Sequence, residues 1–378
     1  MRKILLILAA ILCFTGALFA KGVIKVGGLF ALTGPAAHIG IAQKNACKLI
    51  FDEANAQGGI NGKKIELIEV DTQMNPTKAL LGAKKLVEQD KVCVIIGPTT
   101  TGSGMAIKPY VNKMHVPTFM HAGSDIIIDK PPVKYVFKSP YRSSVALGKI
   151  FQYMKKHGLK TFAFLYSADG FGRDGLKVSK RLAPKYGLKL VAAESFHRKD
   201  VDMTTQLVKV NEKHPDAIIA WTIGPAGGII AKNKKRLGMK QPLFQCHGQC
   251  DPIFLKVAGD AAEGVMMPAT KIYVADQLPN SDPQKKKILH FVKIFKEKYG
   301  YYPGTMVAYG VDAAYLVLEA LKHVGCDREK IRDFLENKTY GYVGISGIYK
   351  ITPKDHNGLG LNDVVLVKVH NGKWVLVK

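Results

Sequence analysis

The chain has few cysteines and few carboxylates for its length. Only 6 of its 378 residues are cysteine, and 30 Asp or Glu oppose 55 Lys or Arg. Loss of Cys13 with an N-terminal signal leaves an odd number of cysteines, which excludes a complete disulfide framework of the kind that holds small secreted domains together. Cys47 and Cys93 lie in apolar patterns, and we interpret both as small buried hydrophobic residues.

A metal site also lacks support. Cys246, His247 and Cys250 form a C-H-x-x-C pattern without a fourth ligand or the paired spacing of structural zinc sites. We therefore expect no metal there. Whether Cys246 and Cys250 form a disulfide stays open.

After its first residues the chain has no apolar run long enough to span a bilayer. Arg2 and Lys3 precede the apolar run from Ile4 to Phe14, and small residues follow up to Ala20. This order is typical of a secretory signal peptide, which we place at residues 1–20. We expect an exported, periplasmic protein.

The signatures of catalysis and of nucleic-acid binding are missing. There is no G-x-S-x-G or H-E-x-x-H motif and no close carboxylate pair. The net charge is +25, yet there is no basic tail and no zinc-finger spacing, and the lysines recur on polar helix faces. We expect no enzyme, no cofactor and no nucleic-acid partner.

Strands and helices alternate along most of the chain, which predicts an open, mostly parallel βα sheet. The first series has strands at 23–30, 64–70 and 92–96 and helices at 41–57, 76–89 and 102–114. A second series begins near residue 145. The pattern predicts two successive Rossmann-like lobes.

Three helices near the C-terminus, at 283–299, 306–323 and 329–337, have no core of their own, so we expect them to dock on the first sheet. The last segment reads as a hairpin that turns at Asn371-Gly372. The chain then crosses several times between the lobes, which predicts a hinge and closure over a ligand. We assign 21–140 plus 269–344 to lobe 1 and 141–268 plus 345–378 to lobe 2.

The segment Val92 to Gly104 is the most informative motif. A buried strand enters a turn of Gly, Pro and hydroxyl residues, and a helix follows from Gly102. Free N–H groups of a first helical turn at the carboxyl end of a strand bind anions. We expect a carboxylate or a similar polar group there.

A second glycine motif has a rival interpretation. Gly170 to Gly175 satisfies G-x-G-x-x-G between a strand and a helix, and Glu194 ends the next strand. Locally this indicates a dinucleotide enzyme. We rank that alternative low, because an exported protein rarely meets a nicotinamide pool.

Several motifs together resemble one family. They are Leu32-Thr-Gly-Pro35, Asn55 to Gly62, Ile96-Gly-Pro98, Asp169-Gly-Phe-Gly172 and Tyr309-Gly-Val-Asp-Ala313. In this order they resemble the periplasmic solute-binding proteins of branched-chain amino acid and amide ABC importers, which are similar to leucine-binding protein. The resemblance implies an α/β type I periplasmic binding protein with two Rossmann-like lobes joined by a multi-strand hinge. It also implies a membrane ABC permease as partner, and we expect a monomer.

The resemblance also implies a ligand site in the cleft. The carboxylate would lie at Thr101 and Gly102 and at Ala122, Gly123 and Ser124, with Phe171 as an aromatic wall. Ile39, Ile223 and Trp221 would add apolar walls, while His121, His247, Gly248 and Arg142 would supply further contacts.

The family's acidic partner of an α-ammonium group would fall near His247-Gly248, where no Asp or Glu stands; Asp251 is the nearest carboxylate. A buried ammonium without an anion is costly. The resemblance implies a branched-chain or other amino acid as the ligand, and the missing acid keeps an aromatic or aliphatic organic acid, or an amide, as alternatives.

Overall fold

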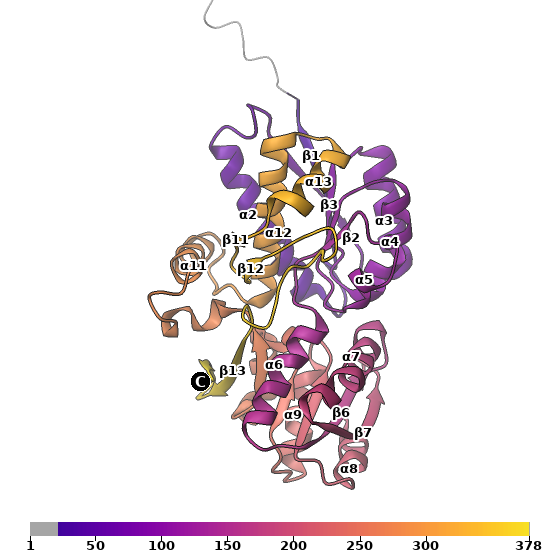
Figure 1. Cartoon of the computed structure of the whole chain (residues 1–378), viewed down its shortest axis with the longest axis vertical. Helices are drawn as coiled ribbons and strands as arrows, with labels where there is room; N and C mark the ends of the chain where they lie inside the picture. Colours follow the sequence, from indigo (N-terminus) through magenta and orange to yellow (C-terminus); the bar gives the residue numbers. More distant parts are fainter. Residues whose placement is uncertain (1–21, 378) are drawn as a thin grey trace, which may run out of the picture.

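Two separate sheets organise the chain, and each is covered by helices to form an α/β lobe. The computed structural model describes residues 22–377, so the predicted signal peptide lies outside the described residues. Figure 1 shows one lobe above the other, with α2, α3 and α12 in the upper lobe and α6 to α9 in the lower lobe.

The first sheet has five parallel strands in the order β2-β1-β3-β4-β5. Its strands are β1 (Ile24–Phe30), β2 (Ile65–Asp71), β3 (Val94–Ile96), β4 (Thr118–Met120) and β5 (Val136–Lys138). Strands β3, β4 and β5 are short and fully buried, as expected when helices cover both faces of a parallel sheet.

The second sheet has the order β14-β13-β10-β9-β8-β6-β7. Five strands are parallel: β6 (Thr161–Ser167), β7 (Lys189–Phe196), β8 (Ala217–Trp221), β9 (Leu243–Gln245) and β10 (Met266–Ala269). The C-terminal hairpin of β13 (Val365–His370) and β14 (Lys373–Leu376) is confirmed, and Asn371 and Gly372 both have positive φ at its turn. A small third sheet pairs β11 (Tyr342–Val343) with β12 (Ile348–Tyr349).

Helices connect these strands and cover the sheets. In the first lobe they are α2 (Ala37–Ala56), α3 (Pro76–Lys84), α4 (Thr101–Lys113) and α5 (Ile126–Asp129), and in the second α6 (Ser143–Lys156), α7 (Gly170–Leu182), α8 (Thr204–Asn211), α9 (Ala226–Arg236) and α10 (Pro252–Ala258). The chain then adds α11 (Lys285–Tyr299), α12 (Thr305–Val324) and α13 (Arg328–Lys338).

The predicted docking of the three C-terminal helices α11, α12 and α13 on the first lobe is confirmed. Helix α12 packs on α2 so closely that a Cβ on Gly310 would lie 2.8 Å from the Cβ of Ala46. Ten consecutive residues of α12, from Thr305 to Ala314, are buried. A helix that is buried all round belongs to the core itself, so α12 completes the first lobe.

The chain passes between the lobes after β5, after β10 and before β13. Lys138, at the end of β5, is buried and donates to the carbonyls of Pro140 (2.6 Å) and Tyr141 (2.5 Å). The Asn357 amide, on the last crossover, donates to the carbonyls of Lys138 (2.8 Å) and Pro140 (3.0 Å). Two crossovers are therefore held together by buried polar contacts.

Part of the last crossover belongs to the first core. Asp312 of α12 accepts the backbone N–H groups of Ile345 and Ser346, both at 2.7 Å. Ile345 and Tyr349 are buried with the hydrophobic cluster of the first lobe, although the sequence analysis assigns residues after 344 to the second lobe. The lobe boundaries stay a prediction.

The interpretation of Cys93 as an unpaired hydrophobic residue is wrong. Cys93, just before β3, is bonded to Cys326, between α12 and α13, with their Cα atoms 5.1 Å apart. Cys47, Cys246 and Cys250 have free, buried thiols, so the Cys246–Cys250 bond is not formed. The odd cysteine count arises from one disulfide and three structural thiols.

We predict that the double substitution Cys93→Ala with Cys326→Ala lowers the free energy of unfolding by about 2–5 kcal/mol, since the bond closes a long loop. Urea denaturation measures this change. A thiol reductant should lower the melting temperature of the wild type and leave that of the double variant unchanged. Equal stability of the two proteins in oxidising buffer would contradict the prediction.

Candidate ligand-binding site

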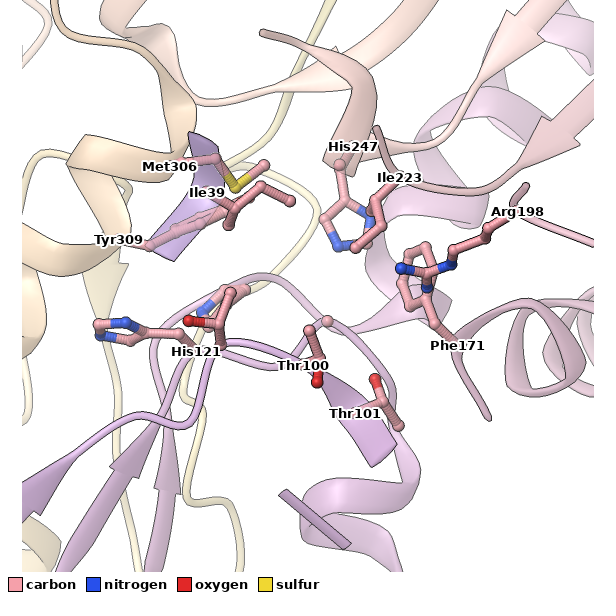
Figure 2. A pocket seen from close by; sticks show the side chains of 14 residues that line it. Ile39, Thr100, Thr101, His121, Phe171, Arg198, Ile223, His247, Met306 and Tyr309 are labelled. Atoms are coloured by element: carbon pink, nitrogen blue, oxygen red, sulfur yellow. The ribbon is translucent and has the colours of Figure 1, made fainter. Parts of the chain in front are cut away.

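A cavity of about 420 Å³ lies between the two lobes. Figure 2 shows its labelled side chains, with Thr100 and Thr101 below, His247 and Ile223 above, Arg198 and Phe171 on one side, and His121 and Tyr309 on the other. Both lobes contribute to the lining, which consists of Ile39, Thr99, Thr100, Thr101, His121, Gly123, Pro140, Phe171, Arg198, Ile223, His247, Gly248, Met306 and Tyr309.

The floor of the cavity is the loop that follows β3. Gly97 has φ +108°, and a Cβ there would lie 2.0 Å from the carbonyl oxygen of Leu29, so only glycine fits the turn. Thr101 begins α4, and its hydroxyl lies 3.0 Å from that of Ser124. The first N–H groups of α4 have no acceptor within the helix, so this loop can receive a carboxylate.

The facing wall comes from the N-terminal end of α7 and the end of β7. Asp169 caps α7 by accepting the N–H groups of Phe171 (2.9 Å) and Gly172 (3.0 Å). The same carboxylate forms an ion pair with Arg198. This pair fixes the guanidinium beside Phe171 at the edge of the cavity (Figure 2). A guanidinium has five N–H donors, so Arg198 can bind Asp169 and a ligand anion together.

The same geometry argues against a dinucleotide site at the G-x-G-x-x-G motif. The N–H groups that would hold a pyrophosphate already donate to Asp169. The glycines serve close packing instead, because a Cβ on Gly172 would lie 1.9 Å from the Ser167 oxygen and one on Gly175 would lie 2.3 Å from Trp221.

Two buried histidines line the cavity, one from each lobe. His121 follows β4, and His247 follows β9 and stands edge-on to Phe171 with ring centroids 5.8 Å apart. Burial lowers the pKa of each imidazole to about 3, and the buried Lys138 contributes to the shift of His247. Both rings are therefore neutral at physiological pH.

No carboxylate side chain lines the cavity within residues 22–377. A Cβ on Gly248 would lie 2.7 Å from Cγ2 of Ile223, so an acidic side chain has no room there. Asp251 instead caps α10 by accepting the N–H of Ile253 (2.9 Å), and burial raises the pKa of its carboxyl. An α-ammonium group would find only neutral acceptors.

Eight of the residues expected from the sequence meet at the cavity: Ile39, Thr101, His121, Gly123, Phe171, Ile223, His247 and Gly248. Gly102, Ala122, Ser124, Trp221 and Arg142 do not line it. Ser124 supports Thr101 from behind, and Trp221 stacks behind Phe171 with centroids 5.8 Å apart. The role of Arg142 as a ligand donor is corrected: it forms ion pairs with Asp129 and, at 2.9 Å, with Asp355, near the crossovers.

Sequence reasoning missed Thr99, Thr100, Pro140, Arg198, Met306 and Tyr309, which also line the cavity. Arg198 lies two residues beyond the carboxyl end of β7, and ligands of parallel α/β sheets bind beyond those ends. That rule could have found Arg198. Tyr309 lies on α12, whose place in the first core no local pattern specifies.

A two-lobed α/β fold with a cavity lined from both lobes is the arrangement expected of a protein that binds a small molecule between its lobes. The family model described as periplasmic binding protein matches residues 23–373, and the chain belongs to this family.

Relatives and solved structures agree with this assignment. The chain is 24% identical to Leu/Ile/Val-binding protein homolog 7 of Brucella suis, over 89% of this chain and 86% of that protein. It is similar to the branched-chain amino acid transporter substrate binding protein LivJ from Streptococcus pneumoniae in complex with isoleucine, with TM-score 0.82 and 25% identity over 94% of this chain and 99% of that one. It is also similar to a solute binding protein of an ABC transporter from Rhodopseudomonas palustris BisB5 in complex with 3,4-dihydroxy benzoic acid, with TM-score 0.79 and 26% identity over 94% of this chain and 96% of that one.

Two further observations concern the described residues. No group of three or more His, Cys, Asp or Glu within 22–377 could hold a metal ion. None of the helices in this range is both long and apolar enough to cross a membrane.

The position of Gly123 allows a test of how closely the two lobes approach each other. A Cβ there would lie 2.8 Å from Phe171 and 3.0 Å from Nε2 of His247, both on the opposite lobe. We predict that Gly123→Ala weakens ligand binding roughly tenfold, because overpacking of this kind costs about 1–3 kcal/mol in the closed form.

Gly102→Ala is the matched control, since the nearest atom to its added Cβ is Cγ of Pro76 at 3.7 Å. This variant should keep the wild-type affinity. Isothermal calorimetry with a ligand found by thermal-shift screening measures both variants, and equal affinities for the two would refute a tight approach of the lobes at Gly123.

Proposed function

We propose that this protein is the extracytoplasmic solute-binding component of an ABC importer and that its ligand is a small organic carboxylate without an α-amino group. Exported to the periplasm, it would close over the ligand and deliver it to a membrane permease. The family membership supports the transport role. The residues that line the cavity support the ligand class.

The proposed ligand class rests on the charge of the side chains that line the cavity. It contains the guanidinium of Arg198 and the hydroxyl of Thr101 but, within the described chain, no carboxylate. A carboxylate oxygen accepts charge-assisted hydrogen bonds from both groups and from free N–H groups of α4. An α-ammonium group in the same cavity would be desolvated without an anion, which costs several kcal/mol.

A branched-chain amino acid is the second candidate, and the names of relatives support it. The structure of LivJ with isoleucine supports it in the same way. Low identity leaves room for a different ligand on the same fold.

The decisive experiment compares leucine with 4-methylpentanoate, which has the same carbon skeleton and no amino group. The proposal expects 4-methylpentanoate and benzoate to raise the melting temperature and leucine to have little effect, because ligands that bind only the folded form stabilise it. Tighter binding of leucine than of 4-methylpentanoate, measured by calorimetry, would overturn the ligand class and leave the transport role intact.

We predict that Arg198→Met weakens binding of benzoate by about 2–5 kcal/mol, since one partner of a desolvated charge pair is removed. Benzamide, a neutral analogue, should lose less affinity. Arg173→Met is the matched control, because Arg173 is exposed on the first turn of α7 and does not line the cavity. Equal losses for the acid and the amide would show that Arg198 acts only through Asp169 and the fold.

We predict that affinity for benzoate changes little between pH 5.5 and 8. Both cavity histidines have pKa values of about 3, so they are neutral throughout this range, and the ligand carboxylate stays ionised. Calorimetry across the range checks this. A rise in affinity as the pH falls below 6.5 would instead indicate that an imidazolium contacts the ligand.

A further inference from the structure

The side of the cavity opposite Arg198 holds polar atoms that have no partner. Both ring nitrogens of His121 are buried and make no hydrogen bond among residues 22–377, and the buried hydroxyl of Tyr309, which the backbone N–H of Tyr141 approaches, donates to no acceptor there. His121 is 3% exposed and Tyr309 is 1% exposed, yet both line the cavity. Figure 2 shows them together on the side away from Arg198 and Phe171. Buried polar side chains are normally paired, so these atoms call for a ligand group.

We propose that the ligand carries a hydroxyl group at the end remote from its carboxylate, and that His121 and Tyr309 bind this hydroxyl. This inference rests on the proposed function, because it places the carboxylate at Arg198 and Thr101. It adds a second polar contact at the far end of the same cavity.

The hydrogen-bonding capacity of His121 and Tyr309 favours a hydroxyl group on the ligand. A neutral imidazole has one N–H donor and one acceptor nitrogen, and a tyrosine hydroxyl also donates and accepts. A hydroxyl group does both and can pair with each of them. A second carboxylate only accepts and would bury another negative charge, whereas an ammonium only donates and would find no anion.

The middle of the cavity selects a flat, apolar spacer between the two polar ends. Ile39, Met306 and Ile223 supply aliphatic surface, and Phe171 supplies an aromatic face. A benzene ring fits such walls and holds its two substituents at a fixed separation, which avoids the cost of ordering a flexible chain. The ligand class is therefore a hydroxylated aromatic acid.

The test titrates benzoate, 4-hydroxybenzoate and 3,4-dihydroxybenzoate into the full-length mature protein by calorimetry. We expect at least one hydroxylated acid to bind roughly tenfold more tightly than benzoate, since the hydroxyl pairs groups that otherwise stay unpaired. In Tyr309→Phe this preference should shrink toward unity.

Tyr273→Phe is the matched control. Its hydroxyl is likewise buried without a partner in the described chain, but Tyr273 does not line the cavity. The variant should keep the full preference for the hydroxylated acid. His121→Phe tests the same contact independently and should reduce the preference for the hydroxylated acid as Tyr309→Phe does.

The outcomes separate the two proposals. Equal binding of benzoate and both hydroxylated acids to the wild type would overturn the hydroxyl contact and leave the carboxylate site standing. A hydroxyl preference that survives in both Tyr309→Phe and His121→Phe would also overturn it. Binding of leucine with no binding of any of the three acids would overturn the proposed function itself.

Discussion

Polar groups that face the cleft must find partners, because closure removes the water that would otherwise solvate them. Most of the site's geometry follows from this constraint. Asp169 is used twice, as a helix cap and as the partner of Arg198, so that no bare carboxylate faces the cavity. The histidines stay neutral for the same reason, and burial is the main cause of their low pKa values. Arg198, Thr101 and the first N–H groups of α4 are then the donors that can attract an anionic ligand.

The features that the sequence predicted correctly are those formed by residues close together in the chain. The loop after β3 was predictable, since a buried strand, a glycine turn and hydroxyl residues follow one another along the chain. The terminal hairpin was predictable from Asn371-Gly372 for the same reason. The bond between Cys93 and Cys326 joins residues 233 positions apart, and no periodicity links them. Arg142 and Arg198 both follow strands, so the rule on the carboxyl ends of strands points to both. The tertiary contacts distinguish them, because Arg142 pairs with Asp355 and Arg198 lines the cavity.

The glycine motif at residues 170–175 shows why a local pattern can carry two meanings. Gly172 and Gly175 are needed in either case, because α7 approaches β6 and Trp221 too closely there for any side chain. What differs is the group that satisfies the first N–H groups of the helix: a bound phosphate in a dinucleotide site, and Asp169 in this protein. An acidic residue directly before such a motif is therefore informative, since it supplies from within the chain the anion that a cofactor would otherwise bring.

The place of α12 has a consequence for how the chain folds. This helix fills the first core but follows the whole second lobe in the sequence, so the contacts between α2 and α12 join segments that lie more than two hundred residues apart. The second lobe has most of its strands in one continuous stretch and can form its core earlier. Chains dominated by such distant contacts fold slowly. During synthesis the first lobe thus stays incomplete, with the apolar surface of β1 and α2 uncovered, until nearly the entire polypeptide has been made.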